Sequence, residues 1–338
     1  MGQRTGWVDV HQHSYHPRLV EMLEGKGITH MAPGVPMPRW RLEDTLRVME
    51  RCDLAAVVLS VLMPDVALRQ PDAAALVRRT NEWTAELVRA RPHRFGALAT
   101  LPLPDVDAAL SEIAYAFDTL GMDGVVLAAS LADGRLLGDP SLDPVLAELD
   151  RRRAVVLIHP DPGFRCSCTG GPDFAAVVPP PLVDFVMDTT RAVTNLLLRG
   201  AFRRFPGIRF ILAHGGGTVP YIAGRLELAE TWVLAGQAEA ERGSVRAALR
   251  GLYFETAQSS SAGALACVHD LAAPGHVLFG TDFPFMNDEV SAATRREVEQ
   301  YQATAAGDIG GAAWDLFPRL RDSAIRQNAV LDSAAERR

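Results

Sequence analysis

The chain has 338 residues, of which 48% are hydrophobic and 22% charged, and its formal net charge is −7. This balance is typical of a globular protein and argues against a disordered or fibrous chain. The modest acidic excess gives no electrostatic reason to expect nucleic acid or an anionic membrane as a partner. The sequence has no apolar run long enough to span a membrane, and its four cysteines are too sparse for a disulfide framework. We therefore expect a cytoplasmic protein.

Residues 8–13 are predicted to form the first strand and carry two histidines near its end. Because side chains alternate along a strand, His11 and His13 project to the same face. Two imidazoles aimed at one point supply the first two ligands that a divalent metal needs. Asp9 lies on the same face one layer deeper, and two roles stay open for it. In one role, Asp9 accepts a hydrogen bond that orients His11. In the other, Asp9 is a buried carboxylate whose hydrogen bonds come from neighbouring strands.

The segment that follows, up to residue 41, is rich in proline and glycine and is predicted to be a long loop with at most a short helix. An amphipathic helix over 42–53 and an apolar strand over 55–61 come next. The same alternation then repeats along the chain. Strands are predicted over 95–100, 124–128, 155–159, 209–214, 252–256 and 277–282, and helices over 72–91, 105–120, 142–152, 218–235 and 262–271. An insertion over 160–181 precedes a further long helix, and a last helix is predicted over 320–332.

Eight strands that are apolar on both faces, each followed by a helix, indicate a parallel sheet. In a chain of this length, eight such units favour a closed (β/α)8 TIM barrel over an open doubly wound sheet. The sequence contains no linker that would divide it, so a single domain over residues 1–338 is expected. The C-terminal helix would cap or brace the barrel.

Several of the predicted strands end in a side chain that can bind a metal. His159 ends the fifth strand and Asp282 the eighth. Since the C-terminal ends of barrel strands meet at one face, these residues are expected to join the pair on the first strand. The sequence therefore predicts a metal site made of His11, His13, His159 and Asp282. This donor set suits Zn²⁺, with Mn²⁺ or Fe²⁺ as alternatives, and leaves room for a water.

The sixth strand ends at His214, which is followed by three glycines. Glycines at a strand-to-helix turn permit unusual backbone angles and the close approach of a ligand. An imidazole at the mouth of the barrel titrates in the range useful for proton transfer. We expect His214 to act as a general acid or base beside the metal, with Asp282 or the metal-bound water as the other candidates. In the insertion, Cys166 and Cys168 could bind a metal, but we expect this segment to be a plain loop.

These residues, in this order, resemble the amidohydrolase superfamily. The narrower resemblance is to its branch of non-oxidative decarboxylases related to aminocarboxymuconate semialdehyde decarboxylase. The segments that carry it are 8–13, 94–102, 137–140, 158–160, 205–206, 213–220 and 280–284. The middle segments, together with 188–191, are most similar to the 6-methylsalicylate decarboxylase type.

The resemblance implies roles for several residues. The four predicted ligands would hold zinc, His214 would be the catalytic histidine beside it, and no organic cofactor is expected. Arg225 matches an arginine that reaches into the neighbouring subunit's site, which implies a homodimer, although a plain surface arginine is the alternative. Arg39 and Arg41, beside Trp40, are candidates for the family's other basic substrate-binding residue.

The metal set and the resemblance together predict the reaction. We expect a zinc-dependent carbon–carbon lyase that removes CO₂ from a small aromatic or unsaturated carboxylic acid, with a salicylate-type acid favoured. One alternative is a hydrolase or hydratase of the same fold that uses a metal-bound hydroxide on an amide, lactone or alkene. Another is a metal-containing binding protein without turnover.

Overall fold

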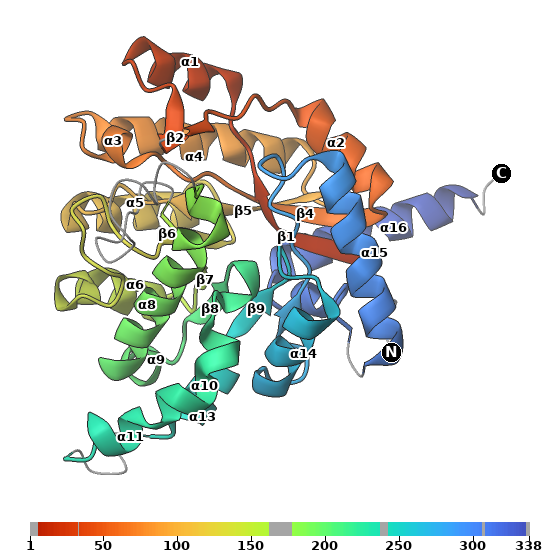
Figure 1. Ribbon diagram of the computed structural model, residues 1–338. Coiled ribbons are helices and arrows are strands. Elements are labelled where there is room, and N and C mark those ends of the chain that lie inside the picture. Colours follow the sequence, from red (N-terminus) through yellow and green to blue (C-terminus); the bar gives the residue numbers. More distant parts are fainter. Residues whose placement is uncertain (1–5, 33, 162–177, 237–242, 306–307, 336–338) are drawn as a thin grey trace.

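The computed structural model describes residues 6–32, 34–161, 178–236, 243–305 and 308–335. Within these ranges, eight parallel strands form a barrel with helices around it (Figure 1), which confirms the predicted (β/α)8 architecture. The barrel strands are β1 (Trp7–His13), β4 (Leu54–Ser60), β5 (Phe95–Thr100), β6 (Gly124–Ala128), β7 (Val155–His159), β8 (Arg209–Leu212), β9 (Tyr253–Glu255) and β10 (Val277–Leu278).

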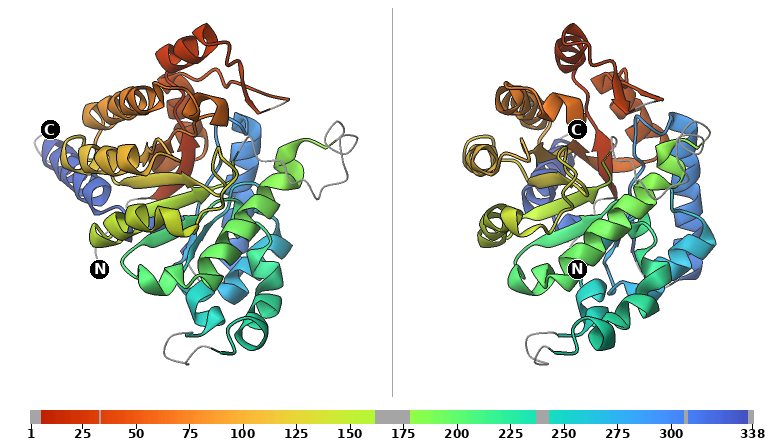
Figure 2. Two further views of the ribbon diagram at one scale, coloured as in Figure 1. Left: turned by 90° about the vertical axis from the view of Figure 1, so that its left-hand side faces the viewer. Right: turned by 60° about the vertical axis from the view of Figure 1, so that its left-hand side comes forward.

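Helices connect successive strands and lie on the outside of the barrel in both further views (Figure 2). They are α1 (Pro17–Gly25), α2 (Leu42–Arg51), α3 (Asp65–Leu68), α4 (Ala73–Ala90), α5 (Val106–Asp118), α6 (Asp143–Arg151), α8 (Asp184–Leu198), α9 (Ala201–Arg204), α10 (Val219–Glu227), α11 (Ala229–Trp232), α13 (Val245–Arg250), α14 (Ala262–Leu271), α15 (Asp288–Thr304) and α16 (Pro318–Ala335). In the described ranges, no helix is both long enough and apolar enough to cross a membrane.

The strands follow one another in sequence order around the barrel, from β1 through β4 to β10. Backbone hydrogen bonds between β1 and the segment that follows β10 close the ring. The Val10 N–H donates to the Phe279 carbonyl at 2.9 Å, and the Asp282 N–H donates to the His11 carbonyl at 2.9 Å. This seam brings residue 282 beside the two histidines of β1.

The barrel strands are buried because helices cover their outer faces. All residues of β7 from Val155 to Ile158 are fully buried. Its neighbour β6 begins at Gly124, where a Cβ would overlap the Val155 carbonyl oxygen. Only glycine therefore allows these two strands to pair at this register.

The segment after β1 is more ordered than predicted. It contains α1 and a hairpin of β2 (His30–Ala32) and β3 (Val35–Pro36). Helix α1 forms because Leu19, Val20 and Leu23 make one buried face, at the three-to-four-residue spacing of an amphipathic helix. The hairpin was not predicted, since strands of two or three residues between prolines and glycines carry no periodic signal.

Two helices complete the C-terminal part of the fold. Helix α15 was not predicted, because the side chains that it buries include Ser291, Thr294 and Arg295 and its pattern is not clearly amphipathic. Helix α16 begins two residues before its predicted start and braces the barrel as expected. Its Arg319 Nη2 donates to the Asp123 carboxylate at 2.7 Å and to the Phe95 carbonyl at 2.9 Å.

Candidate metal centre

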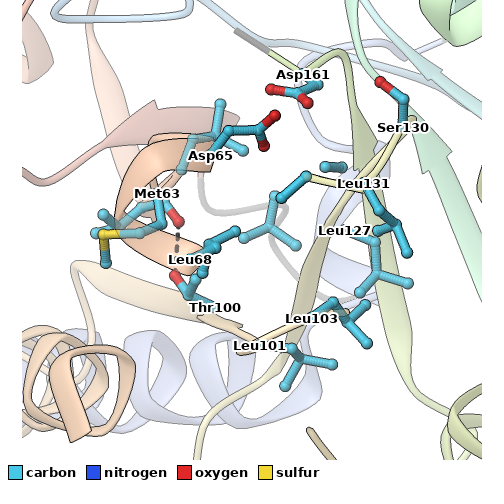
Figure 3. A pocket seen from close by; sticks show the side chains of 15 residues that line it. Met63, Asp65, Leu68, Thr100, Leu101, Leu103, Leu127, Ser130, Leu131 and Asp161 are labelled. Atoms are coloured by element: carbon cyan, nitrogen blue, oxygen red, sulfur yellow. Dashed lines mark hydrogen bonds between the residues drawn. The ribbon is translucent and has the colours of Figure 1, made fainter. Parts of the chain in front are cut away.

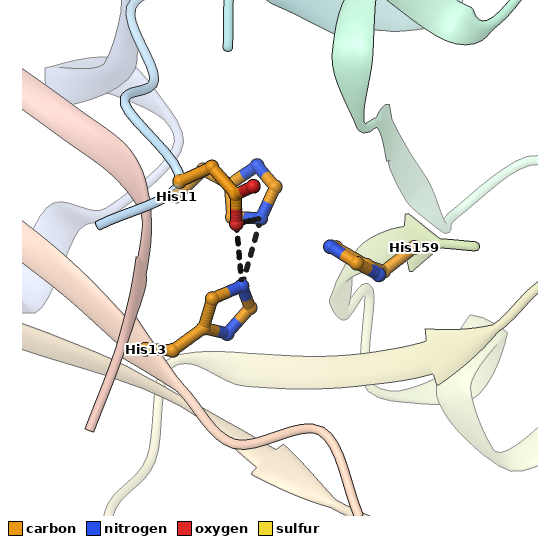
Figure 4. Close-up of side chains that lie close together, drawn as sticks. His11, His13 and His159 are labelled. Carbon is orange, nitrogen blue, oxygen red and sulfur yellow. Dashed lines mark hydrogen bonds and ion pairs between the residues drawn. The ribbon is translucent and has the colours of Figure 1, made fainter. Parts of the chain in front are cut away.

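The four predicted metal ligands meet at the C-terminal end of the barrel. His11 and His13 come from β1 and His159 from β7, and Figure 4 shows the His159 ring facing the other two across the site. Asp282 follows β10 and completes the group. One ligand atom from each of these buried residues lies within 4.8 Å of the others.

The distances between these atoms fit a tetrahedral metal site. The Nε2 atoms of His11 and His13 lie 3.1 Å apart, and Asp282 Oδ1 lies 3.4 Å and 3.1 Å from them. Ligands bound at about 2.0–2.1 Å around a tetrahedral ion are separated by roughly 3.3 Å. These three ligand atoms therefore already lie at about the spacing that such an ion requires.

Hydrogen bonds on the far side of the rings turn Nε2 of His11 and His13 toward the centre. His11 Nδ1 lies 3.0 Å from Glu255 Oε1, and His13 Nδ1 lies 3.1 Å from Ser60 Oγ. An acceptor at Nδ1 fixes the tautomer that carries its proton there and leaves the Nε2 lone pair for a metal.

His159 gives the clearest sign that an ion belongs here. Its Nδ1–H donates to the Pro160 carbonyl at 2.7 Å, whereas its buried Nε2 has no hydrogen-bond partner in the described part of the chain. Burial lowers the pKa values of His11 and His159 well below the usual histidine range, so both rings are neutral, as ligands must be. A divalent cation would satisfy the unpartnered nitrogen, and the donor set fits it.

Asp282 is held as a carboxylate. Burial alone would raise its pKa, but the contact with His13 Nε2 and the nearby His11 and His214 outweigh burial and leave the pKa below its usual value. Oδ2 accepts a hydrogen bond from Gln258 Nε2 at 2.7 Å, so Oδ1 remains turned toward the histidines.

The backbone around the centre is strained. Asp282, His214 and Gln258 have φ values of +62°, +55° and +55°, in the left-handed region that non-glycine residues seldom adopt. Such residues persist only where the surrounding structure fixes them, and they cluster at functional sites. Their gathering here supports this end of the barrel as the functional one.

Glu255 is a buried residue of the centre that sequence analysis missed. Its Oε1 accepts from His11 Nδ1 and, in a short hydrogen bond, from the His214 N–H, and its Oε2 accepts from the Ala257 N–H at 2.6 Å. Burial raises its pKa to about 7, against the opposing effect of His214. The sequence did contain a signal for this residue, since Glu255 places a carboxylate near the end of the mostly apolar strand predicted over 252–256.

Asp9 does not orient the His11 ring; it is a buried carboxylate satisfied partly by its own strand and partly by the segment after β10. Asp9 accepts from the His11 backbone N–H at 3.0 Å, from Gln12 Nε2 at 2.8 Å and from Thr281 Oγ1 at 2.6 Å. Residues two apart on a strand are separated by about 6.6 Å. The Asp9 carboxylate therefore reaches the backbone of His11, while the His11 ring turns to Glu255.

His214 lies beside the four-residue cluster in the turn after β8. Its ring centre is 5.2 Å from the rings of both His11 and His159, and its buried Nε2 has no hydrogen-bond partner among the described residues. The turn requires Gly217, which has a φ of +64° and where a Cβ would overlap the Val186 carbonyl oxygen. This geometry leaves a ring nitrogen of His214 without a described protein partner beside the four predicted ligands.

A small cavity opens above the centre. Most of its lining is apolar, and its polar members are His159, Gln258 and Asp282. The apolar members are Met31, Val35, Leu62, Pro181, Phe185, Phe285 and Met286. Within this described lining there is no lysine or arginine, so a carboxylate entering the cavity would meet its positive charge at a metal.

A second apolar cavity lies at the ends of β4, β5 and β6 (Figure 3). Leucine side chains form its walls, and Asp65 and Asp161 face one another at one end. Burial raises the pKa of Asp65, opposed by its hydrogen bond with Asp161. Leu62 lines both cavities, so the second one adjoins the space above the metal centre.

The predicted substrate residues of the first loop lie elsewhere. Arg39 is exposed and pairs with Glu24 at 2.5 Å, whereas Trp40 is buried and its Nε1–H donates to Thr45 Oγ1 at 2.9 Å. Together with Arg41 they line a different cavity. The geometry therefore does not bring them to the metal centre.

Two further predictions concern residues away from the centre. Arg225 is exposed on α10, so its proposed role depends on another subunit. Cys166, Ser167 and Cys168 of the insertion lie outside the described residues.

Comparison with known proteins agrees with this geometry. The amidohydrolase family profile matches residues 8–330. A 6-methylsalicylic acid decarboxylase of Penicillium expansum is 36% identical over 93% of this chain and 97% of its own length. The crystal structure of an amidohydrolase II protein superposes with a TM-score of 0.78, at 26% identity over 94% of this chain and 99% of that one. A dihydroxybenzoic acid decarboxylase from Polaromonas sp. JS666 with bound manganese has a TM-score of 0.72, at 19% identity over 93% and 97% of the two chains.

Proposed function

Because the chain belongs to the amidohydrolase family, we propose that it is a metal-dependent, non-oxidative decarboxylase of a salicylate-type aromatic acid. The observation that carries this function is the unpartnered Nε2 of His159, aimed at three further ligands beneath a mostly apolar cavity. The similarity to the Penicillium expansum enzyme supports the carboxy-lyase reaction.

His11, His13, His159 and Asp282 would hold the ion. Three imidazoles and one carboxylate suit Zn²⁺, with Mn²⁺ and Fe²⁺ as alternatives. The manganese bound in the Polaromonas enzyme is consistent with a divalent ion in this fold. When bound, the ion supplies a Lewis acid that polarises the oxygens of an acid substrate. Metal content of the purified protein, measured by mass spectrometry, would identify the ion.

The cavity favours a substrate with few polar ring substituents. Phe285 and Phe185 offer aromatic faces, and Met31 and Met286 provide adaptable apolar contacts. A methyl group on the ring would gain free energy from burial here, whereas an additional hydroxyl would find few partners. We therefore expect 6-methylsalicylate to be a better substrate than 2,6-dihydroxybenzoate.

The reaction requires a proton at the carbon that loses its carboxylate. Protonation of that carbon makes the ring an electron sink, so the bond to the carboxylate breaks, CO₂ leaves and the ring regains its aromaticity. His214 supplies this proton from Nε2, which has no competing partner among the described residues.

Replacement of His214 tests the assignment. The protein loaded with metal should release CO₂ from 6-methylsalicylate, and His214→Ala should abolish release while its metal content stays unchanged. Asp282→Asn should lose both. His93→Ala, a partly buried histidine in the turn before β5, is the matched control and should retain activity. Undiminished CO₂ release by His214→Ala would refute the role of His214, and a product that has gained water would indicate hydration.

Arg225 is proposed to complete the site of a second subunit in a homodimer. Two large apolar side chains on the same stretch support an interface, since Tyr221 is 83% and Trp232 74% exposed in the isolated chain. The planar guanidinium of Arg225 is suited to binding a substrate carboxylate. It is favoured over Arg39, which already pairs with Glu24.

Mixing two inactive variants tests this exchange. If each subunit lends Arg225 to its partner, His214→Ala and Arg225→Ala are both inactive alone. After unfolding and refolding together, half of the dimers are mixed and each has one intact site, so about a quarter of the wild-type activity should return. Absence of any recovery, or a monomer in sedimentation, would refute the proposal.

A further inference from the structure

Glu255 contacts both the predicted ligand set and the segment that carries His214. It ends β9, between the strand that leads to His214 and the strand that leads to Asp282. Its side chain is fully enclosed, with 1% of the residue exposed. Both carboxylate oxygens accept hydrogen bonds. Glu255 is not among the described residues that line the cavity above the metal centre.

The contacts of Oε1 reach both the ligand set and the proton donor. It lies 3.0 Å from His11 Nδ1 and also accepts the backbone N–H of His214. The first contact holds the His11 ring with Nε2 toward His13 and Asp282. The second fixes a residue whose φ of +55° needs support from its surroundings.

The neighbouring backbone is shaped around this carboxylate. At Gly280, on the segment after β10, a Cβ would overlap Glu255 Oε2 and lie 3.0 Å from the His11 Cβ. The φ of Gly280 is not in the left-handed region, so backbone conformation does not require glycine there. The requirement is space for the Glu255 side chain.

We infer that Glu255 is a positioning residue that couples the metal site to the proton donor, holding His11 as an Nε2 ligand and fixing the turn that carries His214. The inference rests on the proposed metal-dependent function. It goes further in predicting that one carboxylate sets both metal affinity and the placement of the catalytic imidazole. Neither effect requires Glu255 to touch the substrate.

Glu255→Gln is the direct test, because it keeps the shape and removes one acceptor. Glu255 accepts at both oxygens, so a glutamine must turn its NH₂ group toward at least one N–H donor. Metal affinity, measured by competition with a chelating dye, should fall by about 10- to 100-fold. The visible absorption of the Co²⁺-loaded protein should change, since the His11 ligand is no longer held in place.

Activity at saturating metal separates the two effects. We expect kcat of Glu255→Gln to remain about tenfold below wild type even when the site is filled, because the His214 turn is displaced. Glu112→Gln, which changes another buried glutamate bound to Arg78 and Asn81, is the matched control and should leave metal affinity and kcat unchanged. If Glu255→Gln does not fold, Gly280→Ala provides a second variant, and it should also weaken metal binding.

The outcomes distinguish this inference from the proposed function. Wild-type affinity and an unchanged Co²⁺ spectrum in folded Glu255→Gln would overturn the inference. Complete recovery of kcat by excess metal would overturn the coupling to His214. Failure of the wild-type protein to bind metal or release CO₂ would instead refute the proposed function.

Discussion

The buried carboxylate of Asp188 should make the stability of the protein depend on pH. Asp188 lies in α8 and is fully buried, and its Oδ2 accepts from the Asp161 N–H at 2.8 Å and from Ser130 Oγ at 3.1 Å. Burial raises its pKa from 3.8 to about 6, against the opposing effects of these hydrogen bonds and of Arg191. The unfolded chain therefore loses the Asp188 proton at a lower pH than the folded protein does.

The sign of the effect follows from this difference. Well below pH 3.8 both states are protonated, and the contribution of Asp188 to stability is fully present. As pH rises through about 6, the unfolded state is increasingly favoured, because it gives up the proton more readily. A shift of roughly two pK units corresponds to at most about 3 kcal/mol lost by pH 7.5.

Asp188→Asn removes the titrating group and keeps an acceptor for both donors. Urea unfolding should be measured from pH 4 to pH 7.5 on chelator-treated protein, so that metal binding does not contribute. The free energy of unfolding of Asp188→Asn minus that of wild type should increase over this range by up to about 3 kcal/mol. Asp107→Asn, which changes an exposed carboxylate on α5, controls for the substitution itself. A difference that stays constant or falls with pH would refute the reasoning.

Three further outcomes are expected. Removal of the metal with a chelator should abolish CO₂ release and lower the melting temperature. An ion present at about 1,000 times its Kd stabilises the fold by about 4 kcal/mol. Calorimetry with and without added metal checks this stabilisation. Arg319→Met should cost about 2 kcal/mol in urea unfolding, because it leaves the buried Asp123 carboxylate without its cation; an unchanged free energy would contradict a bracing role for α16. Phe285→Ala should raise KM for 6-methylsalicylate about tenfold with little change in kcat, because the Phe285 ring lines the cavity without taking part in the chemical step. Steady-state kinetics in which kcat falls and KM stays the same would contradict this.

The ligand set could be predicted from sequence because barrel topology converts strand order into proximity. Once His159 and Asp282 are placed at strand ends, the fold brings them to the histidines of β1 without further information. The apolar strands are also readable from sequence, since burial on both faces gives continuous hydrophobic runs.

What could not be predicted depends on side-chain direction and on weak periodicity. Asp9 and Glu255 are both buried carboxylates beside His11, and strand parity favours Asp9, yet only Glu255 reaches the His11 ring. Parity gives the face of a strand but not how far a side chain extends along it. Helix α15 was missed for a related reason, since its buried face contains Arg295 and serine and threonine side chains in place of an apolar stripe.

The seam between β1 and the segment after β10 also sets the order in which the site can form during synthesis. His13 leaves the ribosome early, and its neighbour in the finished site, Asp282, follows 269 residues later. At about 5–20 residues per second, the first histidines wait on the order of 15–50 s for their last partner. The four-ligand site therefore exists only once nearly the whole barrel has been translated, so full metal loading is a late event in the production of the protein.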